Sequence, residues 1–157
     1  MTEQLRVPTI ATAAQVTCAD GRVFSGRVFV PAAAFKHAGP MRAEEWINEP
    51  AKFFPFLPDR EDVPVLLNKD EVVAIGIAAP AKGDDLGSLD NGGTRSVTLE
   101  CGSARFEGDL LIDMPEGQRR VLDTLNRTEP FLTLRASPRW HLVHKRHITR
   151  VLERGKP

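Results

Sequence analysis

Two short polar turns hold the residues of this chain that are best suited to bind a charged ligand. The dipeptides Asn68-Lys69 and His144-Lys145 each lie between two apolar runs with the composition of strands. A lysine ammonium presented from such a turn can contact a phosphate as a point charge, so these four residues are candidate ligand or nucleic-acid contacts. The alternative is that a tight turn simply requires polar residues.

Two asparagines are the second candidates for a ligand or nucleic-acid contact. Asn48 ends the segment Arg42-Ala-Glu-Glu-Trp-Ile-Asn, and Asn126 ends the corresponding segment Arg120-Val-Leu-Asp-Thr-Leu-Asn. If each segment is a helical turn, its arginine can pair with the acidic residue three positions later. An asparagine also suits the position that ends a helix. A capped helical turn and a ligand-contacting amide are therefore both open.

Three histidines, His141, His144 and His147, have a spacing that suggests a metal site. Side chains of an extended strand alternate between its faces, so His141 and His144 are predicted on opposite sides. No acidic or cysteine ligand follows at a spacing that would complete a zinc site. Cys18 and Cys101 have no ligand spacing either, and we predict that they are reduced core thiols. We therefore expect no metal.

Common catalytic signatures are missing from the sequence. It contains no phosphate-binding P-loop, no Gly-x-Gly-x-x-Gly, no Gly-x-Ser-x-Gly and no His-Glu-x-x-His. We therefore expect a protein that is not an enzyme and has no cofactor.

The charge balance gives no general attraction to nucleic acid. Lys plus Arg and Asp plus Glu both number 21. Residues 95–157 nevertheless carry 12 basic and 8 acidic side chains, against 9 and 13 in residues 1–94, which could orient the halves or face a partner. With no apolar run near 18 residues and no secretory signal pattern, we expect a cytoplasmic protein that does not enter a membrane.

The candidate residues recur because the chain repeats itself. Residues 42–75 and 120–151 align with a drift of two residues, which places Lys69 over Lys145. Self-similarity of this kind indicates a duplication. We predict an N-terminal arm at 1–13, a first unit at 14–78, a linker at 79–94 and a second unit at 95–154.

Each unit is predicted to be a small β domain with one helical turn. Asp20-Gly21 predicts a hairpin in the first unit, because glycine supplies the positive φ of a tight reversal. Gly26 and Gly108 lie within the second strand of each unit and predict a sharp bend there. The predicted strands are 15–19, 22–30, 53–56, 63–67, 71–78, 96–101, 104–113, 131–135, 140–143 and 147–152, and the predicted helical turns are 41–48 and 118–125.

The hairpins and the polar turns resemble those of the Sm-like (LSm or Hfq-type) small β-barrels. The motifs are the glycine in the second strand, Asn68-Lys-Asp-Glu-Val, and His144-Lys-Arg-His-Ile. The chain is also similar to a family of uncharacterised bacterial domains that carry Leu-Asn, then Phe-Leu, then an Asn-Lys-x-x-Ile pattern. The resemblance implies two tandem five-stranded Sm-like or SH3-like barrels. The short helical turn of each unit falls between strands two and three, whereas Sm-like proteins begin with a helix before strand one. The resemblance also implies association edge to edge through strands four and five.

The expected function is a non-catalytic binding or assembly module that self-associates through its strand edges. One alternative is a Sm-like RNA-binding protein, in which Lys69 and Lys145 contact RNA. A second alternative is a nucleotide-sensing barrel of the PilZ type. In this chain Arg119-Arg120 would imitate the basic motif of that type.

Overall fold

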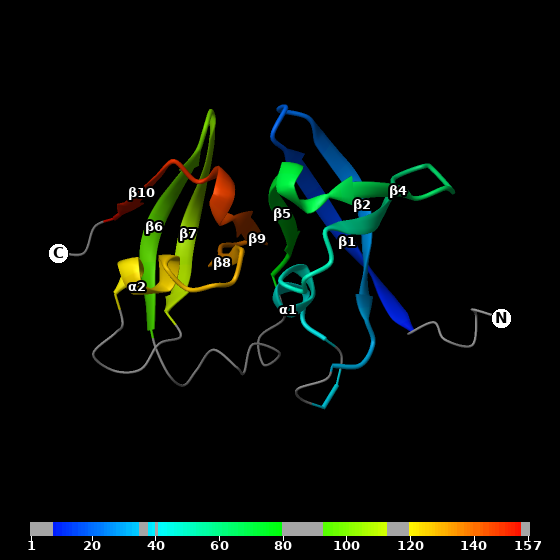
Figure 1. Cartoon of the computed structure of the whole chain (residues 1–157), viewed down its shortest axis with the longest axis horizontal. Helices are drawn as coiled ribbons and strands as arrows, with labels where there is room; N and C mark the ends of the chain where they lie inside the picture. The colour runs from blue at the N-terminus through cyan, green and yellow to red at the C-terminus, as the bar shows by residue number, and fades with distance from the viewer. Residues whose placement is uncertain (1–7, 35–37, 40, 80–92, 113–119, 155–157) are drawn as a thin grey trace.

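The structure is a computed structural model that describes residues 8–34, 38–39, 41–79, 93–112 and 120–154. The described chain is mainly β and forms one open antiparallel sheet of ten strands (Figure 1). The strand order is β10-β6-β7-β8-β9-β5-β1-β2-β3-β4. The two outermost strands, β10 and β4, lie at opposite ends of the molecule (Figure 1).

The same series of elements occurs twice along the chain. Each half has a hairpin, a short α-helix, two short strands, a single turn of 3-10 helix and a last strand. In the first half these are β1 (Thr9–Cys18), β2 (Val23–Pro31), α1 (Ala43–Ile47), β3 (Phe53–Pro58), β4 (Val65–Asn68), η2 (Lys69–Glu71) and β5 (Val72–Ala78). In the second half they are β6 (Gly93–Cys101), β7 (Ala104–Ile112), α2 (Val121–Leu125), β8 (Phe131–Arg135), β9 (Arg139–His144), η4 (Lys145–His147) and β10 (Arg150–Glu153).

The two glycines inside the hairpins stand where neighbouring strands approach closely. Gly26 pairs with Pro58 of β3, and a Cβ at this position would clash with the carbonyl oxygen of Leu57. A Cβ at Gly108 would clash in the same way with the carbonyl oxygen of Arg135, the last residue of β8. Glycine at both positions therefore lets β3 and β8 cross close to their hairpins.

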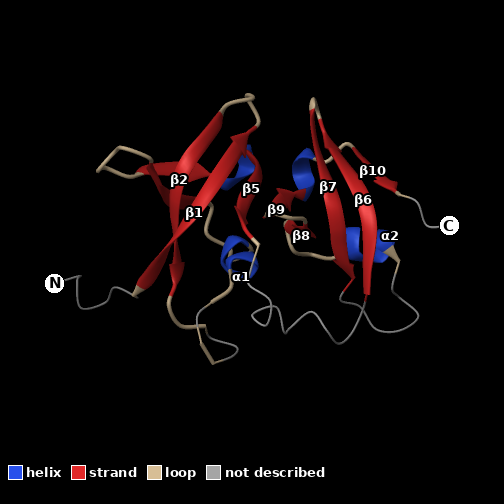
Figure 2. Cartoon of the chain, turned by 180° about the vertical axis from the view of Figure 1, so that it is seen from behind, coloured by secondary structure: helices blue, strands red, loops and turns tan. Residues whose placement is uncertain are grey.

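The two halves meet through a pair of strands at the centre of the sheet. β5 runs antiparallel to β9, with Ile75 opposite Leu142 and Gly76 opposite His141. Trp140 and Leu142 pack into the hydrophobic cluster of the first half, whereas Val73 and Ala74 of β5 join the cluster of the second half. The junction of the halves is therefore continuous core. In both views α1 lies near this junction, beside β8 (Figure 2).

The first strand begins inside the predicted N-terminal arm, residues 1–13, so the predicted end of that arm is wrong. β1 begins at Thr9, and the segment up to Ala13 pairs with β2 from Pro31 back to Arg27. Thr9, Ile10 and Thr12 are β-branched, which favours a strand over a loose arm. β1 is therefore longer than predicted.

Two boundaries in the second half also differ from their predictions. The predicted linker, 79–94, ends too late because β6 begins at Gly93 and pairs with β7; residues 80–92 lie outside the described residues. The last strand begins at Arg150 and not at His147, since Lys145–His147 turn as 3-10 helix. Residues 118–119, predicted to begin the second helical turn, also lie outside the described residues. Neither helix in the described ranges has the length and hydropathy that crossing a membrane requires.

Candidate functional site

Lys69 is buried and holds the end of α1. Its Nζ donates to the carbonyl oxygens of Ile47 at 3.0 Å and Glu49 at 2.8 Å. Such carbonyls at a helix end have no intrahelical partner. Burial lowers the pKa of the ammonium, and the nearby Glu49 carboxylate partly opposes that shift. The preceding Asn68 caps the start of η2, because its Oδ1 accepts a hydrogen bond from the N–H of Asp70 at 3.0 Å.

Lys145 has the same role in the second half. Its Nζ donates to the carbonyl oxygen of Leu125 at 3.1 Å and to that of Arg127, just after α2. Both lysines therefore satisfy helix-end carbonyls within the chain. Contact with a ligand or nucleic acid stays a prediction, and such a contact would compete with these internal hydrogen bonds.

Asn48 joins the two halves through its side-chain amide. Its Oδ1 accepts from the backbone N–H of Phe131 at 2.9 Å, and its Nδ2 donates to the carbonyl of the same residue at 3.3 Å. Nδ2 also donates to the carbonyl of Glu44 at 3.0 Å within α1. The amide thus pairs with Phe131 as a neighbouring strand residue would.

Asn126 follows α2 as Asn48 follows α1. Its side chain is exposed and makes no hydrogen bond to any other described residue. The first-half counterpart of Phe131 is Phe53, which is 55% exposed where Phe131 is 3% exposed. The repeat therefore pairs Asn48 and Phe131 with the counterparts Asn126 and Phe53. These two counterparts do not make the corresponding contact: the Asn126 amide has no partner among the described residues, and the Phe53 side chain is exposed.

His144 lies at the junction of the halves. Its ring is buried and stacks on Phe131, with 4.4 Å between the ring centroids. Its Nδ1 lies 3.3 Å from the carbonyl oxygen of Val72, and Nε2 of His147 lies 2.7 Å from that of Asp70. Because a carbonyl only accepts, each of these ring nitrogens carries the proton. Burial lowers the pKa of His144, which favours the neutral ring.

The three histidines do not converge. The rings of His144 and His147 meet edge to face, whereas His141 packs against Phe106. Within the described ranges, no group of three or more His, Cys, Asp or Glu side chains is arranged to hold a metal ion.

A groove of about 570 Å³ lies between α1 and the segment that joins α2 to β8. It brings Asn48 and Lys145 together, while the other four predicted site residues lie outside it. Its charged lining is mainly acidic and consists of Glu44, Glu45, Glu49 and Glu129 against Arg127 and Lys145. Burial raises the pKa of Glu44. This lining disfavours an anionic ligand.

Four large apolar side chains are exposed on β3, on β4 and in the loop between these strands. We call them the β3–β4 patch, which consists of Phe53 (55% exposed), Val63 (71%), Val65 (44%) and Leu66 (69%). It adjoins β4, whose outer edge pairs with no strand in the described part of the chain. Sequence reasoning missed this patch. The repeat could have indicated it, because it aligns Phe53 and Leu66 with Phe131 and Leu142. In the fold, β5 and α1 of the first half cover Phe131 and Leu142.

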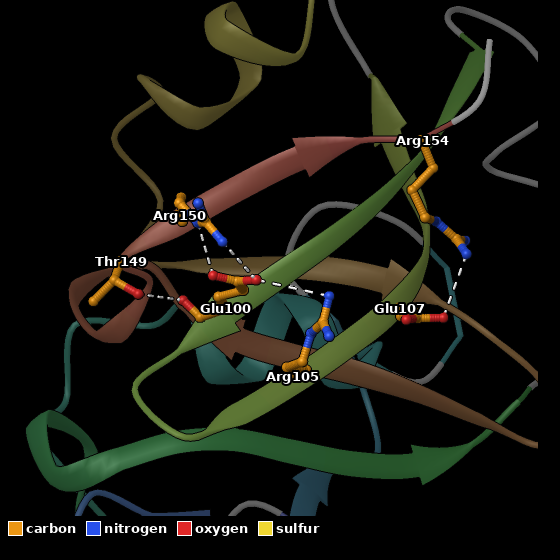
Figure 3. A network of polar contacts seen from close by, with 6 residues as sticks. All are labelled: Glu100, Arg105, Glu107, Thr149, Arg150 and Arg154. Carbon is orange, nitrogen blue, oxygen red and sulfur yellow. Dashed lines mark hydrogen bonds and ion pairs between the residues drawn. The ribbon is translucent and has the colours of Figure 1, made fainter. Parts of the chain in front are cut away.

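The other free edge, β10, is held to the sheet by polar contacts (Figure 3). Arg150 binds the Glu100 carboxylate through Nε at 2.8 Å and Nη2 at 3.2 Å. The Oγ1 of Thr149 donates to the Glu100 carbonyl at 2.9 Å, and Arg154 pairs with Glu107 at 3.3 Å. These contacts order the backbone of β10 while its outer edge stays open.

The basic pair proposed for nucleotide sensing is described only in part. Arg119 lies outside the described residues, and Arg120 forms an ion pair with Asp123 at 3.0 Å. Compared with protein-family models, curated proteins and solved structures, the chain shows no match to any of them.

Proposed function

We propose that this chain is a non-catalytic binding and assembly module whose free strand edges take up further β-strands. The β3–β4 patch carries this proposal. Large exposed apolar side chains beside an unpaired strand edge are unfavourable in water, and added strands are the usual way to cover them. Each half is then a small five-stranded barrel of the Sm-like or SH3-like kind, acting in the cytoplasm.

The internal bonding of the candidate polar residues supports a binding role over catalysis. The amide of Asn48 and the ammonium groups of Lys69 and Lys145 bond to backbone groups of the chain itself. Polar groups that the fold already uses have less capacity to act on a substrate. The free binding capacity lies in the strand edges.

RNA binding is the competing proposal, and the acidic groove together with the occupied lysines disfavours it. It predicts that labelled oligo-A or oligo-U RNA binds at low salt and that the affinity falls steeply as salt rises. We expect no such binding, and the purified protein should show no absorbance from nucleic acid that a high-salt wash removes.

Strand addition can be tested by placing a photo-crosslinking residue at Leu66 or at Leu152 in the cells that make the protein. Val23 is the matched control, because it is equally apolar and 54% exposed but belongs to β2, an interior strand of the sheet. We expect adducts from positions 66 and 152 whose crosslinked peptide, identified by mass spectrometry, is an extended segment. Absence of adducts at both edge positions would contradict the proposal.

A further inference from the structure

The groove between α1 and the segment that joins α2 to β8 has the features of a small-molecule site. Residues of both halves line it, and none of them belongs to the edge strands β4 and β10. Its volume of about 570 Å³ lies within the range of pockets that hold small organic ligands. We propose that this groove binds an aliphatic diamine, a methylene chain with a protonated amino group at each end.

The charge of the lining selects a cation. Four carboxylates and two basic side chains line the groove, which gives it a net charge of −2 when all six are ionised. The acidic residues are Glu44, Glu45, Glu49 and Glu129, and the basic ones are Arg127 and Lys145. A ligand with two positive charges neutralises this lining, whereas an anion is repelled by it.

Two of the four carboxylates keep their charge available for a ligand. Glu129 forms an ion pair with Arg127 at 3.2 Å. Glu44 and Glu49, in contrast, form no ion pair with any described residue. The ammonium group of Lys69 lies near Glu49 but donates to backbone carbonyls. The α1 side of the groove therefore offers two carboxylates to the two amino groups of a diamine.

The environment of Glu44 lacks a counter-charge. Burial raises the pKa of its carboxyl, and Arg42 and Arg135 only partly oppose that shift. A half-buried carboxylate is stabilised when a cation lies against it. A bound ammonium group would supply this cation.

The repeat separates the acidic residue that the fold uses from the one that it does not. Glu45 corresponds to Asp123, and each accepts a hydrogen bond from the backbone N–H of the arginine three residues before it. This contact caps the start of α1 and of α2. Glu44 corresponds to Leu122, so a helical turn of this kind does not depend on a carboxylate at that place. The fold thus accounts for Glu45 and leaves Glu44 to another role.

Thr124 of α2 adds a polar group whose hydrogen-bonding capacity is unused. It lines the groove and is 6% exposed. Its Oγ1 is buried and has no hydrogen-bond partner among the described residues. Burying a hydroxyl without a partner is unfavourable. Because a hydroxyl oxygen accepts hydrogen bonds, an ammonium group of the ligand would satisfy it.

The rest of the lining suits a methylene chain. The apolar residues of the groove are Ala34, Met41, Leu110, Leu111, Phe131 and Leu132. An inorganic dication gains nothing from such side chains, whereas an alkyl chain is favoured against them. The described acidic side chains are also not grouped to hold a metal ion. Both observations favour an organic dication.

Calorimetric titration of the full chain with four probes tests the class of ligand. Hexamethylenediamine, hexylamine, hexanediol and adipate share a six-carbon chain but carry two, one and no positive charges and two negative charges, respectively. At about 0.15 M salt, which screens attraction between exposed charges, we expect the diamine to bind with a Kd of about 0.1–1 mM. Hexylamine should bind about tenfold more weakly, since it lacks one charged contact. Hexanediol and adipate should not bind.

Three variants test the position of the site. Glu44→Gln should weaken binding of the diamine about tenfold, and Thr124→Val about threefold, because each removes one contact to an ammonium group. Glu61→Gln is the matched control, since it removes an exposed carboxylate outside the groove. The melting temperature of the free chain should not fall in Thr124→Val or Glu44→Gln, because neither group has a partner that the substitution would leave unsatisfied. A structural role for either residue would lower it.

Several results would overturn the proposal. Equal affinity for the diamine and for hexylamine or hexanediol would mean that two charges are not recognised. Equal losses in Glu44→Gln and Glu61→Gln would mean diffuse attraction, and unchanged binding in either groove variant would place the ligand elsewhere. Absence of heat from the diamine up to about 10 mM would mean that the groove is no site for it. Strand addition is tested separately by the crosslinks at Leu66 and Leu152.

Discussion

Asn48 and Phe131 lie 83 residues apart in the chain, and the side-chain amide of the first bonds to both backbone groups of the second. The amide connects the end of α1 to the start of β8, at the place where His144 stacks on the Phe131 ring. One side chain of the first half thus completes the hydrogen bonding of a strand in the second half. The halves are one folding unit at this junction.

The Asn48 contact predicts an unequal effect of the same substitution in the two halves. We expect Asn48→Ala to lower the free energy of unfolding by about 1–3 kcal/mol, because it leaves the buried N–H and carbonyl of Phe131 without a partner. Asn126→Ala should change it by less than about 0.5 kcal/mol in dilute protein, as is usual for an exposed side chain. Urea unfolding measures both, and equal losses would contradict the prediction.

The two buried lysines predict a second comparison. Lys69→Met keeps most of the side-chain volume but removes the donor to Ile47 and Glu49, so we expect a loss of about 1–3 kcal/mol in the free energy of unfolding. Lys145→Met should cost less, since its side chain is more exposed and water can replace the donor. Lys52→Met, at an exposed site, should stay within about 0.5 kcal/mol. Urea unfolding of the three variants is the measurement, and a stable Lys69→Met protein would reject the helix-end role.

Local patterns predicted the elements well, because they depend on neighbouring residues. The Asp20-Gly21 turn, the positions of Gly26 and Gly108 and both helical turns are readable from composition and spacing. The fold beyond that depends on contacts across the chain. The pairing of β5 with β9 leaves no local signal, since a buried apolar strand has the same composition whichever strand it joins.

The candidate site was predicted in part for the same reason. Asn48 and Lys69 were found as polar residues at repeated positions, but their partners lie about twenty or more residues away, beyond the reach of any local pattern. The β3–β4 patch was missed because Phe53 and Leu66 have the composition of core residues, and only the fold shows that nothing in the described chain covers them.

The buried histidine predicts that the junction weakens in mild acid. Burial lowers the pKa of His144 below its ordinary 6.5, and burial together with Arg139 lowers that of His141. As the pH falls through about 6.5 the unfolded chain takes up these protons first, so stability falls until the folded pKa values are reached. We expect a lower melting temperature at about pH 5.5 than at about pH 8.

A double variant tests the source of this pH dependence. His141→Gln with His144→Gln removes both titrating rings and should flatten the change in melting temperature above about pH 5, whatever it does to stability itself. Glu44 must be kept apart from the test. Burial raises the pKa of its carboxyl, so its protonation favours the folded state at lower pH. An unchanged slope in the double variant would mean that other groups cause the effect.

The Glu100 carboxylate predicts fraying of β10 in stronger acid. Its hydrogen bonds from Arg150 and the charge of that residue lower its pKa. The stabilisation is therefore present above the unfolded pKa and is lost as the pH falls through the folded one. At neutral pH Glu100→Gln should speed hydrogen exchange at Leu152 more than Glu107→Gln, which breaks only a contact between exposed side chains. Equal exchange in the two variants would show that Arg150 does not hold the strand.

The glycines inside the strands predict which backbone positions accept a methyl group. A Cβ at Gly26 or Gly108 meets carbonyl oxygens of the neighbouring strand, and backbone cannot move aside as a flexible side chain can. We expect Gly26→Ala and Gly108→Ala each to cost about 1–3 kcal/mol or more in the free energy of unfolding. Gly76→Ala is the matched control in β5, because its nearest neighbour would be Cδ of Arg139 at 3.5 Å, an ordinary contact. Urea unfolding compares the three, and if Gly76→Ala costs as much as the others, then loss of glycine in a strand, rather than close approach of the strands, sets the penalty.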